Sequence, residues 1–473
     1  MRRTLRRRRL LATLAGGAVG ATAIGSVGSA RTTGQDGTTE SEQGALAWMR
    51  THSGDGTRLT AANAAVEAGG DGYLVAGRQA TGEQGADAWV ASFDGDGRSQ
   101  WDRRYEGGAR GRIETVVANG DGTYFLAGGR ASENTTGGWA ATVAADGSIQ
   151  WEERYSSAAM IRSATATDEG YLLIGATPTR TLWIAAIDET GAIEWQRTER
   201  GQFGYGVVPD GDGGYLLAGA EIGDDRNLRP WIASIVDTGR QRWARSYETQ
   251  GIAYDLAPTD DGFVLTGLAR GPGEATAAAY VAHLDRNGHQ RWHRTYGPND
   301  RNVLFAVTTV DDTALAGGWT GVESTGDAWL MAIDDAGDRQ WDRTYDPGAW
   351  DRFDGLVPTD DGVLLLGGSG TDALLGLYDP SGQSAGQPPR TTASPAPDTP
   401  TTDGRTDSPA RQSTAGTGTA STPTVGESTA GAADATEPAT TTGSGPGLGV
   451  TSAVAGLGSA AAALWARRRT DEN

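Results

Sequence analysis

Two tryptophans, Trp319 and Trp350, stand outside the repeated tryptophan pattern that occupies most of this chain. Aromatic side chains beside polar loops suit stacking on a sugar ring or contact with a partner protein. Arg78, Arg130 and Arg270 are expected at the same end of the fold. The sequence therefore predicts an exposed ligand-binding surface formed by Trp319, Trp350, Arg78 and Arg130. The alternative interpretation is that the two tryptophan-bearing loops pack on each other.

Carboxylates supply a second candidate chemistry. Glu114, Asp255 and Asp354 fall in the short strands that open a repeat, where we expect them to line a central channel as a cation site or as a hydrated wall. Asp351 and Asp354 are acids of the kind that polysaccharide-cleaving enzymes use in pairs. No nucleophile and base converge in the sequence pattern, so we predict no catalytic residue.

No metal or cofactor site is predicted. Aspartate-glycine turns such as residues 94–97 recur at the hairpins, where these residue types satisfy turn geometry, and no glutamate follows at the twelfth position of a calcium loop. His283, His289 and His293 are close in sequence, but the strand pattern does not bring them together. Cysteine is absent, which excludes disulfides and thiolate ligands.

The charge of the chain is strongly negative. All 40 basic residues are arginine and the formal net charge is −20. Residues 1–30 contain six arginines and no acid, so their removal gives −26. This excess of carboxylates argues against nucleic acid or anionic lipid as a partner of the folded part. An acidic surface without lysine resembles the hydrated surfaces of proteins from halophilic archaea.

The N-terminal region is typical of an exported protein. Residues 1–30 have a basic start, an apolar stretch and the small residues Gly28-Ser29-Ala30, which is the layout of a signal peptide. Arg7-Arg8-Arg9-Leu10-Leu11 resembles a twin-arginine signal, and the resemblance implies the export machinery that reads it. Asn134-Thr135-Thr136 is an acceptor sequence for N-glycosylation, so Asn134 is a candidate site in an exported protein.

The C-terminal region is typical of a surface anchor. Residues 387–444 are almost wholly Thr, Ser, Ala, Gly, Pro and Asp, which predicts a disordered stalk. Residues 445–473 include an uncharged stretch, 447–466, followed by three arginines, which predicts a transmembrane helix. Pro446-Gly447-Leu448 with this stretch resembles the PGF-CTERM sorting signal of archaeal surface proteins, except that Leu448 replaces phenylalanine. The resemblance implies that an archaeosortase exchanges the helix for a lipid.

A repeat fills the region between residues 45 and 386. Seven tryptophans mark it, six of them four residues after a turn glycine: Trp48, Trp101, Trp151, Trp195, Trp243, Trp292 and Trp341. Each unit contains four short apolar stretches bounded by Asp and Gly, which predict four antiparallel strands. The second strand closes on a glycine in every unit: Gly77, Gly128, Gly175, Gly219, Gly267, Gly317 and Gly367.

Four strands per repeat of this length are typical of a propeller blade. We therefore predict an all-β fold, a seven-bladed β-propeller over residues 45–386. A blade hides its faces only against its neighbours, so we expect a closed ring in which Trp48 supplies the strand missing after Gly382. Blade seven is then split between residues 45–51 and 351–383. Burial of the tryptophans is expected to hold the blades together.

The element Asp-x-x-Gly-x-x-x-Trp, as in residues 94–101 and 285–292, is similar to the tryptophan-docking repeat of quinoprotein-like propellers, and this similarity covers about 340 residues. The resemblance implies architecture but no cofactor. Quinone-dependent dehydrogenases of that family have eight blades and usually a vicinal cysteine pair, which this chain lacks.

These patterns predict a cell-surface-anchored extracellular propeller that acts as a binding or interaction module for an unidentified glycan or protein. An extracellular polysaccharide-degrading enzyme is the first alternative, and a structural protein of the cell envelope is the second. The predicted partners are the membrane, the export machinery and an archaeosortase, and nucleic acid is not among them.

Overall fold

The computed structural model describes residues 45–380 except 54–59, 71, 82–84, 106–109, 132–135, 271–276, 298–300, 323–324 and 348–349. The regular elements of this part are the strands β1 to β28, which belong to one compact unit. Among the same residues, no helix is long and apolar enough to cross a membrane. The predicted signal peptide, stalk, C-terminal anchor and glycosylation site Asn134 lie outside them.

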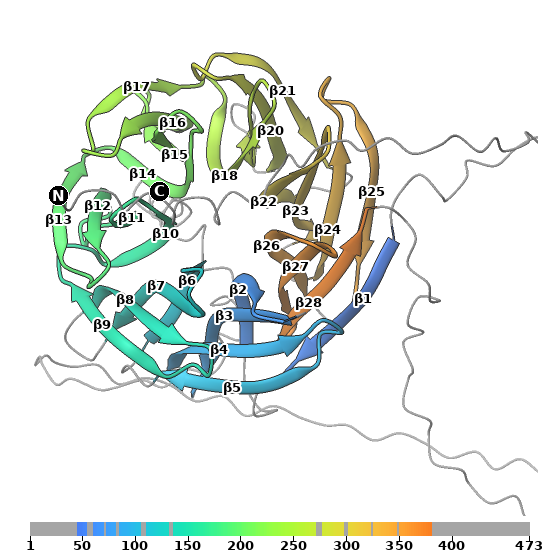
Figure 1. Ribbon diagram of the computed structural model, residues 1–473. Helices are drawn as coiled ribbons and strands as arrows, with labels where there is room; N and C mark the ends of the chain where they lie inside the picture. Colours follow the sequence, from blue (N-terminus) through green and yellow to red (C-terminus); the bar gives the residue numbers. More distant parts are fainter. Residues whose placement is uncertain are drawn as a thin grey trace, which may run out of the picture. The chain divides into compact units, whose positions relative to one another are not determined.

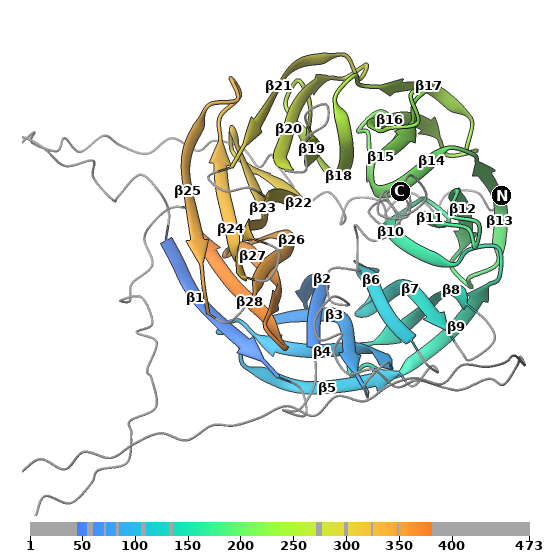
Figure 2. The same ribbon diagram turned by 180° about the vertical axis from the view of Figure 1, so that it is seen from behind.

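The strands form seven antiparallel, four-stranded sheets arranged around a central axis (Figure 1), which confirms the predicted all-β, seven-bladed propeller. A parallel bridge between Ala86 and Arg110 joins the sheets of blades one and two. In each blade the first strand lies nearest the axis and the fourth lies outermost, as both views show (Figures 1 and 2). The first strands therefore line the central channel.

The first strands are β2 (Thr60–Ala68), β6 (Arg110–Ala118), β10 (Met160–Ala166), β14 (Gln202–Pro209), β18 (Gln250–Thr259), β22 (Arg301–Val310) and β26 (Asp351–Thr359). The second strands are β3 (Gly72–Ala80), β7 (Thr123–Ala131), β11 (Gly170–Ala176), β15 (Gly214–Ile222), β19 (Gly262–Arg270), β23 (Thr313–Val322) and β27 (Gly362–Ser369). The third strands are β4 (Ala86–Asp94), β8 (Thr136–Ala144), β12 (Leu182–Asp188), β16 (Leu228–Val236), β20 (Ala278–Asp285), β24 (Thr325–Ile333) and β28 (Asp372–Asp379). The outer strands are β5 (Ser99–Tyr105), β9 (Ile149–Tyr155), β13 (Ile193–Glu199), β17 (Gln241–Ser246), β21 (Gln290–Tyr296), β25 (Arg339–Tyr345) and β1 (Ala45–His52).

Blade seven takes its outer strand from the beginning of the described chain. β1 pairs antiparallel with β28, with Ala45 opposite Asp379. On the other side of this sheet, β2 of blade one contacts β26, β27 and β28. The ring of Trp48 lies 6.4 Å from that of Tyr73 in β3, measured between centroids. Segments from the two ends of the described chain thus form one sheet, and blade one packs against it.

Six outer-strand tryptophans contact the hairpin turn of the following blade. The glycine in that turn has a positive φ and leaves no space for a side chain, because a Cβ at Gly97 would lie 2.5 Å from the ring of Trp48. The same contact joins Trp101 to Gly147, Trp151 to Gly191, Trp195 to Gly239, Trp243 to Gly288 and Trp292 to Gly337. The tryptophan and the glycine recur at one period because each blade supplies a ring to one neighbour and a turn to the other.

The arginine and tyrosine that follow the tryptophan hold the same turn. In blade one, Arg103 donates Nε–H to the carbonyl oxygen of Asp146 at 2.5 Å, and Tyr105 donates its hydroxyl to that of Gly147 at 2.7 Å. The guanidinium of Arg103 also lies 6.0 Å from the centroid of the Trp101 ring. Other blades repeat these bonds through Arg50, Arg197, Arg245, Arg294, Tyr155, Tyr247 and Tyr296. One face of each outer strand therefore carries the contacts to the next blade.

A second row of large side chains forms the buried core. Its members stand in the third strands and are at most 2% exposed: Trp89, Trp139, Trp183, Trp231, Tyr280, Trp329 and Leu374. The outer-strand tryptophans, by contrast, are only half-buried. The expected burial of that row is therefore partial, because one side of each ring covers a turn and the other faces solvent.

Candidate functional site

A β-bulge interrupts the first strand of every blade at the same position. In β2 the register with β3 shifts between Ala62 and Ala64, which leaves Asn63 outside the ladder. A bulge re-aims the side chain of the extra residue. The corresponding residues of blades two to seven are Glu114, Arg162, Tyr205, Tyr254, Phe305 and Asp354. We call these seven residues the bulge ring, and all of them line one cavity in the central channel.

A glycine in the second strand makes each bulge possible. A Cβ at Gly77 would lie 1.9 Å from the carbonyl oxygen of Ala61, so only a residue without a side chain allows this approach. The same holds at Gly128, Gly175, Gly219, Gly267, Gly318 and Gly367. In blade six the glycine at this position is Gly318, which pairs with Leu304, and the neighbouring Gly317 pairs with Ala306 after the bulge.

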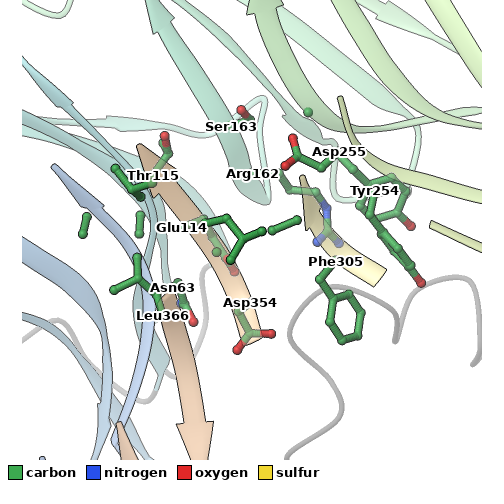
Figure 3. A pocket seen from close by; sticks show the side chains of 18 residues that line it. Asn63, Glu114, Thr115, Arg162, Ser163, Tyr254, Asp255, Phe305, Asp354 and Leu366 are labelled. Carbon is green, nitrogen blue, oxygen red and sulfur yellow. The ribbon is translucent and has the colours of Figure 1, made fainter. Parts of the chain in front are cut away.

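The cavity has a volume of about 250 Å³ and is lined by the first strands of all seven blades. In Figure 3, Arg162, Tyr254 and Phe305 lie on one side of it, and Asn63, Thr115 and Leu366 lie on the other. The polar members of the bulge ring are consecutive around the channel, as are the aromatic members. The cavity thus has a charged half and an aromatic half.

Three consecutive bulge residues, Tyr205, Tyr254 and Phe305, form what we call the aromatic arc. The ring centroids of Tyr205 and Tyr254 are 5.2 Å apart in an edge-on arrangement, and those of Tyr254 and Phe305 are 5.3 Å apart. Burial raises the pKa of both tyrosine hydroxyls, which keeps them neutral. The arc therefore presents uncharged ring surface to the cavity.

Four arginines interact electrostatically with one another near the start of the first strands, and we call them the arginine rim: Arg78, Arg112, Arg162 and Arg352. Of these four, only Arg162 lines the cavity. Arg112 pairs with Glu114 at 2.6 Å and Arg352 with Asp354 at 2.7 Å. Both acids are nearly buried, with side chains 3% and 5% exposed. The rim lies where the first strands begin, and we call that end of the channel its mouth.

Burial lowers the pKa of Arg78 to about 10, and the nearby guanidinium groups of Arg352 and Arg112 add to this effect. Burial likewise lowers the pKa of Arg112, against the attraction of Glu114. Arg162 lies with its guanidinium 5.0 Å from the ring centroid of Tyr205, at the junction of the two halves. With a pKa of about 10, Arg78 stays protonated at neutral pH and adds a positive charge to the mouth.

Asp255 also lines the cavity and links two blades. Its carboxylate accepts hydrogen bonds from the backbone N–H of Val307 in blade six, at 3.0 Å, and from that of Leu256, at 2.9 Å. Desolvation raises its pKa to about 6 in spite of these bonds. Of the three channel carboxylates expected from the sequence, all line the cavity, but each is already held by an arginine or by backbone amides.

The sequence predicted an exposed pair of tryptophans, and the structure corrects this. Trp319 lies within β23 rather than in a loop and is 5% exposed. It packs in the same apolar cluster as Tyr205 and Tyr254, behind the aromatic arc. Trp350 is half-buried, with its ring 6.3 Å from that of Trp319 and the guanidinium of Arg352 4.8 Å from its centroid. The two tryptophan rings therefore lie close together, and their contacts are with other side chains of the protein.

The other predicted residues separate into two groups. Arg78 belongs to the arginine rim, and Arg270 lies near Tyr254 and Arg301. Arg130 instead pairs with Glu152 at 2.7 Å and covers the ring of Trp139, so it belongs to the side of blade two. Asp351 is fully buried at the start of β26 and does not line the cavity, so it is not available to a ligand in the channel as the enzyme alternative requires.

The three histidines do not share a partner. His283 contacts Thr259, His289 contacts Asp285, and His293 contacts Gln290. No group of three or more His, Asp or Glu side chains that could hold a metal occurs in the described part of the chain.

Five bulge residues escaped prediction: Asn63, Arg162, Tyr205, Tyr254 and Phe305. A signal for them was present, because each bulge residue stands 13 or 14 residues before the glycine opposite it. The glycine repeat therefore marks the ring once the bulge is known. The bulge itself cannot be recognised in the sequence, because the residues at this position are of several different types.

The fold and channel define the class of the molecule as a seven-bladed β-propeller with a lined central cavity. No protein-family model matches the chain, and a comparison with curated proteins gives no match. Among solved structures it is similar to the WD40 β-propeller domain of Doa1 (13% identity, TM-score 0.48), which covers 71% of this chain and 96% of that one. It is also similar to the Neurospora crassa Pan2 WD40 domain (12%, 0.48; 72% and 96%) and to the propeller domain of the Trilobed protease from Pyrococcus furiosus (11%, 0.44; 68% and 96%).

Proposed function

We propose that this protein is an exported, cell-surface-anchored propeller that binds a ligand through the mouth of its central channel. The observation that carries the proposal is the bulge ring. A regular strand would leave these seven positions in the ladder, yet every blade departs from it to turn one side chain into the same cavity. Bulges are frequent where a side chain must be re-aimed toward a site.

Binding suits the ring better than hydrolysis of a polysaccharide. Glycoside hydrolysis needs two carboxyl groups at the scissile bond, one of them able to give up a proton. Glu114 and Asp354 are each neutralised by an arginine, and Asp255 accepts two backbone hydrogen bonds. We therefore favour a binding module and keep the polysaccharide-degrading enzyme as the second candidate.

Export and anchoring rest on the sequence outside the described residues. The twin-arginine pattern in residues 1–30, the stalk at 387–444 and the PGF-CTERM-like segment at 445–473 support a head held outside the cell. They also support the export machinery, the membrane and an archaeosortase as partners. The lysine-free, acidic composition supports a halophilic archaeal host, and the ligand is then a glycan or protein of its surroundings.

The binding proposal is tested with a variant that fills the channel. Ala64 lines the cavity, so Ala64→Phe should abolish binding on an array of glycans and cell-envelope proteins. Ala192→Phe, at an exposed turn between β12 and β13, is the matched control and should bind like the wild type. If both variants bind the ligand equally well, the channel is not the binding site. Release of reducing sugar from a polysaccharide would favour the enzyme. If the protein shows neither binding nor sugar release and is present in the envelope in stoichiometric amounts, a structural role would be favoured.

The location is tested separately on whole cells. Protease added to intact cells should remove the propeller, whereas a variant with residues 7–9 changed from arginine to lysine should remain inside and be protected. Protection of the wild-type head in intact cells would contradict surface exposure while leaving the binding proposal intact.

A further inference from the structure

Two hairpin turns at the mouth end of the propeller carry an arginine in a left-handed backbone conformation. In the turn between β11 and β12, the N–H of Thr177 donates to the carbonyl oxygen of Thr181 at 2.9 Å, and the N–H of Arg180 donates to that of Thr177 at 2.9 Å. Residues 223–227, between β15 and β16, form the same two bonds, with Arg226 in the place of Arg180. The φ angles of the two arginines are 61° and 62°.

The turns between the third and fourth strands have the same geometry but hold glycine at this position. In blade one, Asp94 and Arg98 form the same pair of bonds around Gly97, and glycine also takes the place in blades two to six. There a tryptophan ring excludes a Cβ as well, but in either kind of turn the left-handed φ favours glycine. Arginine at positions 180 and 226 therefore makes the turns less stable than glycine would. Retention of a strained residue indicates that its side chain has a role.

The turn of blade three lies beside the connection from β13 to β14. Leu182, two residues after Arg180, pairs with Glu199 in the ladder of β12 and β13. Arg200 follows Glu199 directly and is exposed. The turn with Arg180 and the connection with Arg200 are therefore neighbours at the mouth end.

The same connection also contacts the turn of blade four. Gly201 accepts a hydrogen bond of 2.8 Å from the N–H of Ile222, the last residue of β15, and the turn with Arg226 begins at the next residue. We call Arg180, Arg200, Ile222 and Arg226 the arginine corner. These four described residues do not line the channel cavity, so the corner is a second surface at the same end of the propeller.

The three arginines of the corner are exposed, and their side chains form no ion pair or hydrogen bond with any described residue. The neighbouring acids, by contrast, are paired, Glu199 with Arg197 at 3.7 Å and Asp225 with Arg229 at 3.3 Å. Five arginines and four acids occur in the segments that form the corner: 177–181, 197–202 and 221–229. The corner therefore offers unpaired guanidinium groups on a chain whose formal net charge is −20.

Ile222 places an aliphatic side chain among these charges. It is 41% exposed, and only three large apolar side chains in the described part of the chain are exposed to this degree. Arginine around an apolar centre is typical of a protein interface. The corner has no aromatic ring on which a sugar could stack. A guanidinium presents a planar fork of donors that matches a carboxylate. These features favour an acidic protein over a glycan.

We propose that the arginine corner binds an acidic segment of a partner protein, whose carboxylates are held by the three arginines and whose aliphatic side chain packs on Ile222. This surface is separate from the channel of the proposed function, so the two proposals are tested independently. The strained turns hold two of the arginines at the tips of neighbouring hairpins, where a partner can reach both.

Fluorescence anisotropy with labelled peptides tests the proposal. The probe is a short peptide of glutamates around a central leucine, and its counterparts carry glutamine in place of glutamate or serine in place of leucine. We expect the probe to bind at least tenfold more tightly than the glutamine peptide and more tightly than the serine peptide. Binding should weaken as the potassium chloride concentration rises, because salt screens the charges. Equal affinity for the glutamate and glutamine peptides would overturn the proposal.

Glycine variants separate binding from stability. The double variant Arg180→Gly, Arg226→Gly removes two charges and suits the left-handed φ, so it should weaken binding of the probe at least tenfold while its melting temperature stays equal or rises. The matched control Arg98→Ala, Arg240→Ala removes two exposed arginines from turns at the opposite end and should bind like the wild type. Equal losses in the two double variants would mean that only net charge matters and would overturn the proposal. A clear fall in the melting temperature of the glycine variant would assign the arginines to folding and would also overturn it.

Two further outcomes would identify another occupant and overturn the proposed one. Polygalacturonate that binds more tightly than the peptides, and is lost in the glycine variant, would make the ligand an acidic glycan. Self-association of the wild type in sedimentation velocity, lost in the same variant, would make the partner a second copy of this chain.

The channel variant separates this inference from the proposed function. Ala64→Phe should bind the probe like the wild type, because the corner lies outside the channel. Loss of the probe in Ala64→Phe would place the peptide in the channel and overturn this inference alone. If an array ligand is lost in Ala64→Phe and no peptide binds, only this inference fails. If the probe binds at the corner and Ala64→Phe leaves the array unchanged, only the proposed channel function fails.

Discussion

The indole N–H of Trp48 donates a hydrogen bond of 2.9 Å to the carbonyl oxygen of Gly95, 47 residues further along the chain. Trp48 belongs to the outer strand of blade seven and Gly95 to a hairpin turn of blade one. The bond therefore joins the sheet that contains both ends of the described chain to the first complete blade. The same type of bond joins other neighbouring blades, through Trp195 and Trp292.

Replacing Trp48 should destabilise the protein substantially. Trp48→Ala removes this hydrogen bond and the ring contacts with Gly97 and Tyr73, and we expect a loss of about 2–4 kcal/mol in the free energy of unfolding, since full burial of the ring is worth somewhat more. Denaturant titration measures it. Trp101→Ala removes the equivalent contact between blades one and two and should cost a similar amount. An unchanged midpoint for Trp48→Ala would mean that this contact adds nothing to stability.

The glycines opposite the bulges should not tolerate a methyl group. In Gly219→Ala the Cβ would lie 1.8 Å from the carbonyl oxygen of Phe203, so the strands must separate, at a cost of about 1–3 kcal/mol or more. Gly69→Ala is the matched control, because nothing lies within 4 Å of its Cβ. The two melting temperatures should differ clearly, with that of Gly69→Ala close to the wild type. Equal values would show that the second strands do not need glycine.

Asp255 should make stability depend on pH. Its folded pKa, about 6, lies above the unfolded value of about 3.9, so the folded state binds more protons between these values. The stabilisation is complete below about pH 4 and is lost as the pH rises through 6, by roughly 2–3 kcal/mol for a shift of about two units. Asp255→Asn should remove this difference, as urea unfolding from pH 4 to 7 would reveal. A parallel pH profile for the two proteins would contradict the assignment.

Trp319 should contribute to folding more than to binding. The sequence alone predicts that alanine at Trp319 and Trp350 abolishes binding with little effect on the melting temperature. Because Trp319 is buried behind the aromatic arc, Trp319→Ala should instead cost about 3–5 kcal/mol in the free energy of unfolding. Ile222→Ala, at a position 41% exposed, serves as the control and should be nearly neutral. A folded, fully stable Trp319→Ala protein that fails to bind would restore the earlier interpretation.

Loss of the acid beside Arg112 should destabilise the protein. Glu114→Gln leaves the guanidinium without its charged partner at 2.6 Å, and breaking such a pair costs about 3–5 kcal/mol in the free energy of unfolding. Denaturant titration measures the loss. Glu194→Gln, at an exposed position of β13, provides the comparison and should be nearly neutral. Equal stabilities of the two variants would show that the pair adds nothing to the folded state.

The repeat made the propeller predictable. The tryptophan of one blade packs on the turn glycine of the next, and this contact occurs six times between Trp48 and Gly337. The two residue types therefore recur in the sequence at a fixed spacing. The third-strand row of large side chains follows from strand alternation in the same way. The number of strands and blades could therefore be predicted from the periodicity of the sequence alone.

The channel site was only partly predictable. Glu114 and Asp354 were recognised because acids in the strands nearest the axis are conspicuous, whereas Tyr254 and Phe305 look like ordinary core residues of a strand. Whether such a residue points into a sheet interface or into the channel depends on a one-residue shift of register, which neither composition nor hydrophobic pattern records. Trp319 was misplaced for the opposite reason, since a strand longer than expected carried it out of the loop and into the core.

The pairing of Ala45 with Asp379 fixes the side of the propeller at which the described chain begins and ends. Both residues lie where β26 ends and β27 begins, whereas Arg352 and its partner Gly368 lie near the other end of the same sheet. The described part of the chain thus begins and ends at the side of blade seven opposite to Arg352. A tether attached behind Asp379 would orient the opening toward the surroundings and keep it clear of the lipid, so that ligands could reach it by diffusion without passing between protein and membrane.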